Sequence, residues 1–179
     1  MRRILGDRML VEIIKHTDIS TAHEAIEFTT GHRFEPRASL ESIYGWNHSI
    51  SRTQMFSVKM YDIPTFVSVH FVRHKIWVEH FVKSNRPDRD GDDNANRHTP
   101  VNHMMFCNAE ALINMSHRRL CCKSSMETVK LMSIIKVAML DIDYALAQHL
   151  VPMCQFRGGI CSEPVPCGSY KIKRFGGDR

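Results

Sequence analysis

Cationic and imidazole side chains gather in one short stretch near the middle of the chain. Arg73, His74 and Lys75 follow an apolar segment that begins after Pro64, and Ser84-Asn85-Arg86 lies in a polar stretch beyond them. Arginine offers phosphate a planar, two-pronged donor and lysine a point charge, while imidazole can donate to a ring carbonyl or nitrogen. These residue types suit an anionic, ring-bearing ligand. The same residues would also suit the basic, solvated end of a helix.

Composition limits the class of protein. The 179 residues are 43% hydrophobic and 24% charged, which predicts one folded domain and excludes a wholly disordered chain. The net charge of +5 indicates an anionic partner, either a nucleic acid or the phosphates of a nucleotide or cofactor. The longest apolar run, 131–140, is broken by Ser133 and Lys136, so no membrane span is expected. Without the apolar run of a signal peptide near Arg2 and Arg3, we expect a cytoplasmic protein.

Local patterns predict the elements that position these residues. Short β-branched or alternating runs indicate strands, and capping side chains before apolar periodic segments indicate helices. The segment 84–99 has no large apolar residue and predicts a solvated or ligand-ordered loop. The fold class is therefore α+β, a small antiparallel or mixed sheet packed against about four helices, with residues 1–150 as one domain and 151–179 as a cysteine-containing tail. The predicted elements are strands at 9–15 and 55–61, a helix from Asp18 or Ser20 to Gly31, one from Ser39 to Gly45, one from Pro64 to Val72, one at 102–120, and one that begins with a Ser124–Glu127 capping box.

The chain resembles the flavin-dependent thymidylate synthases over about residues 9–150. The family signature is Arg-His-Arg, seven residues, then Ser-x-Arg; here the triplet is Arg73-His74-Lys75, and Ser84-Asn85-Arg86 comes one residue late. His48 lies 25 positions before Arg73, as a histidine does in the family. The downstream series of the family is matched by Asn108, Asn114, Arg119 and Glu127.

The resemblance implies an FAD enzyme that converts dUMP to dTMP with methylenetetrahydrofolate and NADPH. It also implies a homotetramer with active sites between subunits. The implied cofactor-binding residues are His48, Arg73, His74, Lys75, Asn108 and Asn114. The implied substrate-binding residues are His70, Ser84, Arg86 and Arg119, and His74 and Arg119 are the implied catalytic residues.

Three departures from the family pattern leave other functions open. Thr53 stands for a glutamate, His70 for a glutamine and Glu110 for an arginine. They are compatible with a phage enzyme that modifies another pyrimidine nucleotide, such as a hydroxymethylase, or with a non-catalytic protein that binds nucleic acid or a host factor on the same fold. The acidic residues of the 84–99 segment nearly cancel its positive charge, so strong nucleic-acid binding is not expected.

Six cysteines in a chain expected to be cytoplasmic indicate thiols or a metal rather than disulfides. Cys154, Cys161 and Cys167 are spaced by seven and six positions. Structural zinc sites usually contain tighter Cys-x2–4-Cys pairs, so zinc is possible but less favoured than thiols.

Overall fold

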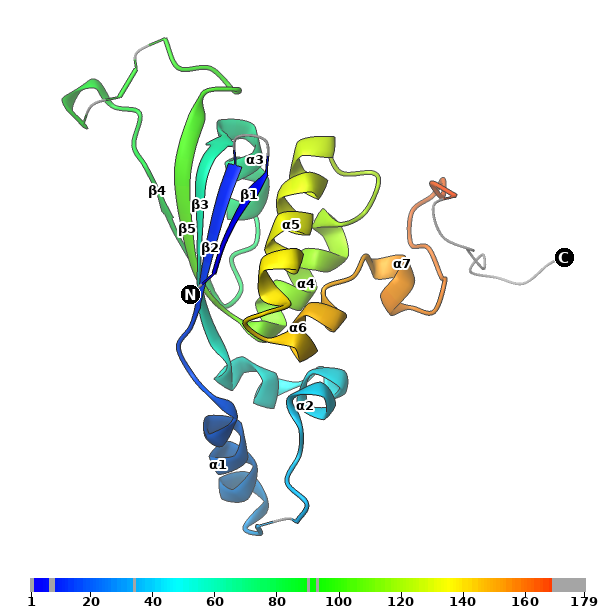
Figure 1. The fold of residues 1–179 in the computed structure, drawn as a ribbon. Helices are drawn as coiled ribbons and strands as arrows, with labels where there is room; N and C mark the ends of the chain where they lie inside the picture. The colour runs from blue at the N-terminus through cyan, green and yellow to red at the C-terminus, as the bar shows by residue number, and fades with distance from the viewer. Residues whose placement is uncertain (1, 7–8, 34, 90, 93, 169–179) are drawn as a thin grey trace, which may run out of the picture.

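A five-stranded sheet, covered by helices on one face, forms the body of the computed structural model (Figure 1). The structure describes residues 2–6, 9–33, 35–89, 91–92 and 94–168, with the backbone alone for 2–6. The strand order is β1-β2-β3-β5-β4, and every neighbouring pair is antiparallel, which confirms the α+β class with an antiparallel sheet. The strands are β1 Arg2–Gly6, β2 Met9–Lys15, β3 Met55–Pro64, β4 Val78–Val82 and β5 Pro100–Asn108.

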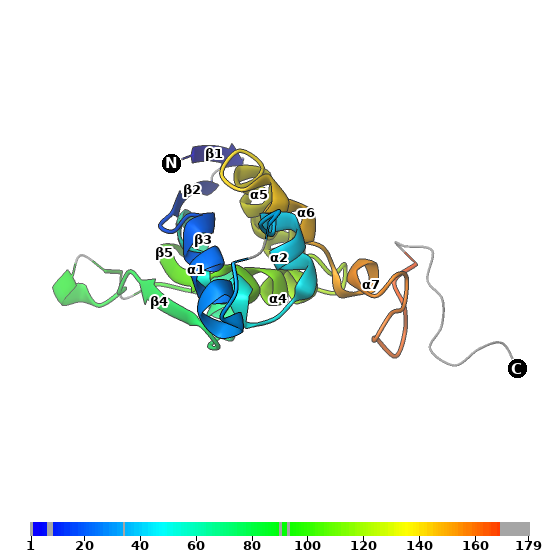
Figure 2. The ribbon, with the colours of Figure 1, turned by 90° about the horizontal axis from the view of Figure 1, so that it is seen from below.

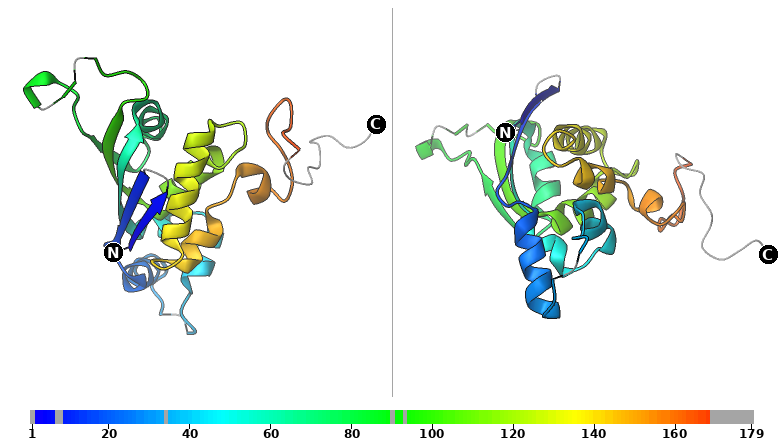
Figure 3. Two further views of the ribbon diagram at one scale, coloured as in Figure 1. Left: turned by 45° about the horizontal axis from the view of Figure 1, so that its top comes forward. Right: turned by 60° about the horizontal axis from the view of Figure 1, so that its bottom comes forward.

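Within the described residues there are seven α-helices, more than the four expected. The two helices that no predicted segment covers are short and follow the last sheet-covering helix in the sequence. Helices α3, α4 and α5 lie on one face of the sheet, and α1 and α2 lie beyond its lower end (Figures 2 and 3). No described helix is long and apolar enough to cross a membrane. The helices are α1 Ile19–Thr30, α2 Leu40–Trp46, α3 Thr65–Val72, α4 Ala109–Arg119, α5 Met126–Met139, α6 Tyr144–His149 and α7 Met153–Phe156, with 3-10 segments at Ser49–Thr53 and Pro87–Arg89.

The core lies between the sheet and helices α4 and α5. Alternate residues of the strands point into it, as the period of a half-covered strand requires. Each helix adds an apolar stripe, and burial of such side chains contributes roughly 25 cal/mol per Å² to folding. The contributors that are fully buried include Val11, Ile13, Phe56, Val58, Met105, Cys107, Leu112, Leu131, Ile135 and Ala138.

Several predicted elements are confirmed to within a few residues. The strand at 9–15 is β2, and the strand at 55–61 is the first part of β3. Asp18 caps α1 by accepting from Ser20 N, and Gly31, with φ of 70°, ends it, because glycine takes a left-handed conformation without steric cost. Helix α3 follows Pro64 directly.

The predicted helix at 102–120 is wrong in its first half. Residues 100–108 form β5, and the helix begins at Ala109 with Asn108 as its cap. Val101, His103, Met105 and Cys107 are buried in alternation, which is the signature of a strand. Strand β4 was not predicted at all, and it pairs with β5 along its whole length. The predicted placement of Asn108 and Asn114 together on one helix is therefore also wrong.

Two predicted helix boundaries need correction. Helix α2 passes Gly45 and ends at Trp46, and Asn47 is its C-cap, with a φ of 49° that an asparagine tolerates better than most residues. Helix α5 is capped by Ser125, which accepts from Thr128 N, so the Ser124–Glu127 capping box does not form. The Ser124 hydroxyl instead donates to the carbonyl of Arg118 at 2.8 Å and closes the turn after α4.

Asp143 connects three elements through one buried carboxylate. Its side chain accepts from the Tyr44 hydroxyl of α2 at 2.7 Å and from the ammonium of Lys15 on β2 at 2.7 Å. It also caps α6 by accepting from Leu146 N at 3.0 Å. Burial, followed by the charge of Asp143, raises the pKa of Tyr44, so this hydroxyl remains a donor at any working pH.

We expect Asp143→Ala to lower the free energy of unfolding by about 3 kcal/mol, because it leaves the buried Tyr44 hydroxyl without its acceptor and removes the partner of Lys15. Chemical denaturation measures the change. Glu24→Ala, on the exposed side of α1, is the control and should cost under about 0.5 kcal/mol. An equal effect of the two substitutions would contradict the role of Asp143.

Candidate functional site

The side chains of three predicted site residues lie together where the C-terminal ends of α3 and α4 meet. Arg119 Nε donates to His74 Nε2 at 2.9 Å, and Arg119 Nη2 donates to the backbone oxygen of His70 at 2.6 Å. The His70 ring extends the group toward α5, with its Nδ1 2.8 Å from the Thr128 hydroxyl. Because Arg119 is always a donor, His74 Nε2 must be an acceptor, and a neutral His74 therefore carries its proton on Nδ1.

The electrostatics of this group favour an uncharged His74 beside a charged Arg119. Burial, then the charge of Arg119, lower the pKa of His74 to about 4. Burial also lowers the pKa of His70, with further contributions from the neighbouring arginines. The pKa of Arg119 itself is lowered by burial and then by the charges of Arg73 and Arg118. The site is thus positively charged through its arginines, while His74 is a neutral hydrogen-bond donor.

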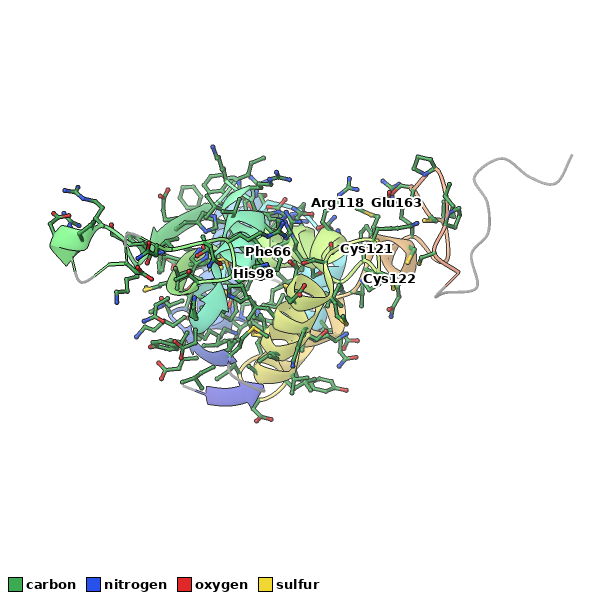
Figure 4. All side chains as sticks on the ribbon, turned by 90° about the horizontal axis from the view of Figure 1, so that it is seen from above. Phe66, His98, Arg118, Cys121, Cys122 and Glu163 are labelled. Atoms are coloured by element: carbon green, nitrogen blue, oxygen red, sulfur yellow. The ribbon has the colours of Figure 1, made fainter. Side chains whose placement is uncertain are left out.

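Arg97 belongs to this group, and it comes from the segment that the sequence predicted as a solvated or ligand-ordered loop. Its guanidinium lies 4.8 Å from the ring centroid of Phe66, and its charge lowers the pKa of His70. The carbonyl of Arg97 accepts from Phe66 N at 3.0 Å, so the end of the loop closes the first turn of α3. Figure 4 looks onto this end of the molecule, where Phe66 lies beside His98 with ring centroids 5.4 Å apart. The sequence offered only its position near the end of the polar 84–99 segment as a signal.

The rest of the basic triplet occupies an exposed turn between α3 and β4. Arg73 ends α3 and lies close enough to Arg119 to affect its pKa. Lys75 is exposed. Trp77 closes the turn with φ of 60°, and the guanidinium of Arg52 lies 5.3 Å from its ring centroid. The triplet therefore presents its cations on the surface next to Arg119.

Ser84 and Arg86 are not brought to this group within the chain. They lie in the loop that projects beyond β4 and β5 in Figure 1. Arg86 is paired with Asp88 through two N–O contacts of 2.9 Å, and the Ser84 hydroxyl accepts from Arg86 N at 3.2 Å. Both residues are thus engaged locally, away from Arg119.

His48, Asn108 and Asn114 also lie apart from Arg119. His48 caps the 3-10 segment, stacks on Trp46 with centroids 5.6 Å apart, and lines a cavity of about 880 Å³ between α1 and α2. Asn108 is buried and its side-chain oxygen accepts from Ala111 N at 2.9 Å, whereas Asn114 is exposed on α4. Glu110, which stands where the family pattern described above has an arginine, forms an ion pair with Arg52.

Five of the six cysteines line a second cavity, of about 430 Å³, between the end of α4 and the tail. Arg118 and Glu163 face each other across it at 4.0 Å, and Figure 4 shows them near the cysteines that follow α4. In the part of the chain that the structure describes, no three His, Cys, Asp or Glu side chains are arranged to hold a metal ion. The cysteines of the cavity are Cys121, Cys122, Cys154, Cys161 and Cys167.

Comparison with known proteins supports the fold and leaves the activity open. The structure is similar to that of Thymidylate Synthase X (ThyX) from Helicobacter pylori, solved with FAD and dUMP. The TM-score is 0.61 at 14% sequence identity, and the match covers 78% of this chain and 99% of that chain. No family model matches the sequence, and no curated protein matches it significantly. The similarity therefore confirms the fold that the resemblance implied, and at this identity it shows the fold alone.

Three histidines make stability dependent on pH. His74, His103 and His117 each have a pKa of about 4 when folded, mainly through burial, against an ordinary value of 6.5. Between these values the unfolded chain binds more protons, so stability should fall as pH falls through that window. We expect a loss on the order of 1 kcal/mol per histidine from pH 7 to pH 5 in chemical denaturation.

The variant His117→Phe should remove about a third of this pH-dependent loss, since His117 packs on Phe156 and a phenyl ring keeps that contact. Its stability at pH 7 is the internal control. A pH dependence that is unchanged by the substitution would contradict the assignment of His117.

Proposed function

We propose that this protein is a flavin-dependent enzyme that methylates dUMP reductively to dTMP, with methylenetetrahydrofolate as the carbon donor and NADPH as the reductant. The observation that carries the proposal is the group where α3 meets α4, in which the half-buried His74 and Arg119 lie beside the exposed Arg73. The fold in which it lies is similar to that of a protein solved with FAD and dUMP.

Electrostatic repulsion within the group favours an anionic ligand. Arg73, Arg97 and Arg119 form no ion pair with a carboxylate among the described residues, and their charges act on one another or on His70. A phosphate that binds here would relieve this repulsion and would accept several charge-assisted hydrogen bonds. Because Arg119 is half-buried, its bonds to a phosphate would be less screened by solvent than those of the exposed Arg73 and Arg97.

FAD fits the donors that are present. Arg73 and Lys75 would hold its phosphates, and the Nδ1–H of His74 would donate to an acceptor of the flavin ring. Bound FAD would supply the hydride for the reductive methylation. Arg119, with His70, would bind the nucleotide. All these residues lie within residues 1–150, so the cysteine-bearing tail, 151–179, contributes none of the proposed catalytic groups.

Assembly into a homotetramer would bring Ser84 and Arg86 of one copy to the site of another. The loop with Ser84 and Arg86 projects from the body of the chain, where it can reach a second copy. The sheet face without helices exposes Phe81 and Phe106, which are 59% and 37% accessible. Exposed aromatic side chains on one face favour burial against another subunit. A site between copies would thus combine the loop of one with Arg119 of another.

Replacement of Arg119 should weaken nucleotide binding. Arg119→Ala removes charge-assisted hydrogen bonds worth about 1.5–3 kcal/mol each, so dUMP affinity should fall about ten- to a hundredfold. Arg119→Lys should recover part of it, because a point charge lacks the fork geometry. Calorimetric titration of dUMP into the flavin-loaded protein measures both, with Arg33→Ala, at an exposed ion pair far from α4, as the control.

Purified protein that neither carries FAD nor takes it up would contradict the proposal before any variant is made. FAD-loaded protein that ignores dUMP but binds another pyrimidine nucleotide would instead favour the alternative of a pyrimidine-modifying enzyme. Absence of both flavin and nucleotide binding would favour the non-catalytic binding protein.

Light scattering tests the assembly. We expect a mass several times the 20.7 kDa of the chain, and we expect Phe81→Glu to shift the population toward smaller species, because a charge on the uncovered face opposes its burial. Phe28→Glu, at a more exposed position on α1, is the control. A monomer at micromolar concentration in the unsubstituted protein would contradict the tetramer.

A further inference from the structure

A series of hydrogen bonds, here called the serine–histidine chain, connects α3, β5 and β4 to the turn between α3 and β4. This turn, residues 73–77, carries Arg73, His74 and Lys75 and is called the triplet turn below. The Ser68 hydroxyl lies 3.0 Å from His103 Nδ1. His103 Nε2 lies 2.9 Å from His80 Nδ1. His80 Nε2 lies 2.7 Å from the backbone oxygen of His74. Ser68 and His103 are buried, so most of the serine–histidine chain lies inside the protein.

The last acceptor fixes the direction of every hydrogen bond in the serine–histidine chain. A backbone carbonyl only accepts, so His80 Nε2 must carry a proton. In a neutral imidazole the other nitrogen is then bare, so His80 Nδ1 accepts from His103 Nε2–H, and His103 Nδ1 accepts from the Ser68 hydroxyl. Burial, and then the interaction with His80, lower the pKa of His103 to about 4, which keeps it neutral. With both imidazoles neutral, the serine–histidine chain therefore has a single arrangement of protons.

The triplet turn needs such support, because it contains an unfavourable backbone conformation. Trp77 has φ of 60°, where a bulky residue is strained by about 1–3 kcal/mol and persists only if its surroundings hold it. The Arg52 guanidinium packs on the Trp77 ring at one end of the turn. At the other end, His80 binds the carbonyl of His74 and fixes the plane of that peptide.

We propose that the serine–histidine chain positions the triplet turn, so that the imidazole of His74 faces the guanidinium of Arg119. A peptide plane held through its carbonyl sets the direction of the adjoining side chain. A displacement of about 1 Å would exceed the range of the 2.9 Å contact between His74 Nε2 and Arg119 Nε. The proposal goes beyond the function proposed above, because it concerns how the protein builds the cationic site, whichever anion binds there.

Nuclear magnetic resonance of the full chain, with ¹⁵N-labelled imidazoles at pH 7, tests the arrangement of protons. The expected spectrum has His80 and His103 neutral with the proton on Nε2, and His74 neutral with the proton on Nδ1. No flavin or nucleotide is needed, so failure of the proposed function leaves this test intact. His80 with a bare Nε2, or charged, would overturn the proposal.

Variants at His80 test the positioning. His80→Phe keeps a ring but removes both hydrogen bonds, and hydrogen exchange of Arg119 Nε–H should become about tenfold faster or more as the His74 contact opens. His80→Gln places an N–H near the former Nε2 and should restore most of the protection. His16→Phe is the control, because His16 bonds a hydroxyl, that of Ser57, on the other face of the sheet.

Ser68→Ala gives an independent test should His80→Phe fold poorly. It removes the donor to the buried His103 Nδ1 without introducing bulk. The His74 carbonyl still requires a proton on His80 Nε2, so the proton arrangement should stay the same, while exchange of Arg119 Nε–H should become faster because His103 and His80 are held less firmly. Circular dichroism melts check that each variant is folded. If folded His80→Phe and Ser68→Ala both keep wild-type exchange at Arg119 and a wild-type His74 spectrum, the positioning role is excluded.

Discussion

A half-buried guanidinium that donates to neutral acceptors, rather than to a carboxylate, is the contact on which the candidate site depends. Arg119 satisfies two of its donors with His74 Nε2 and with the carbonyl of His70. Neither acceptor carries a negative charge, so the charge of the guanidinium is not cancelled. The carbonyl of His70 is also one of the last in α3, where helix carbonyls lack partners within the helix. The protein therefore holds the cation in place and leaves its field available for an anion.

The directions of the strands explain why several cations can gather there. Strands β3 and β5 are antiparallel neighbours, and each is followed directly by a helix, α3 and α4. The two helices thus start at opposite ends of the sheet and run back over the same face, so their C-terminal ends meet. Helix C-termini carry partial negative charge, which favours nearby cations by about 0.3–1 kcal/mol each. Arg73 and Arg119 end these two helices, and their mutual repulsion is offset in part by this effect.

The sequence predicted the cationic residues but not the network beneath them. His74 and Arg119 stood out through residue type and family resemblance, and both are in the group. Strand β5 was mistaken for a helix because its inward positions include His103, a polar residue that interrupts the apolar alternation. His103 can lie in the core because its ring forms a hydrogen bond with His80, which belongs to a different strand. Because this partnership depends on the register between β4 and β5, no local pattern could have indicated it. Asn108 is the converse case, since an asparagine at the start of a helix is as well explained by capping as by ligand binding.

Glu110, a departure from the family pattern, supports the same turn from the other end of α4. The carboxylate sits in the first turn of the helix, where the dipole favours it, and forms an ion pair with Arg52, whose guanidinium packs on Trp77. Glu110 and Arg119 are nine residues apart, about 13.5 Å along a helix at 1.5 Å per residue. Arg119 at one end of α4 therefore contacts His74, and Glu110 at the other end is connected to Trp77 through Arg52. An arginine at position 110 would repel Arg52 and weaken its contact with Trp77. The glutamate at this position therefore helps to hold the strained conformation of Trp77.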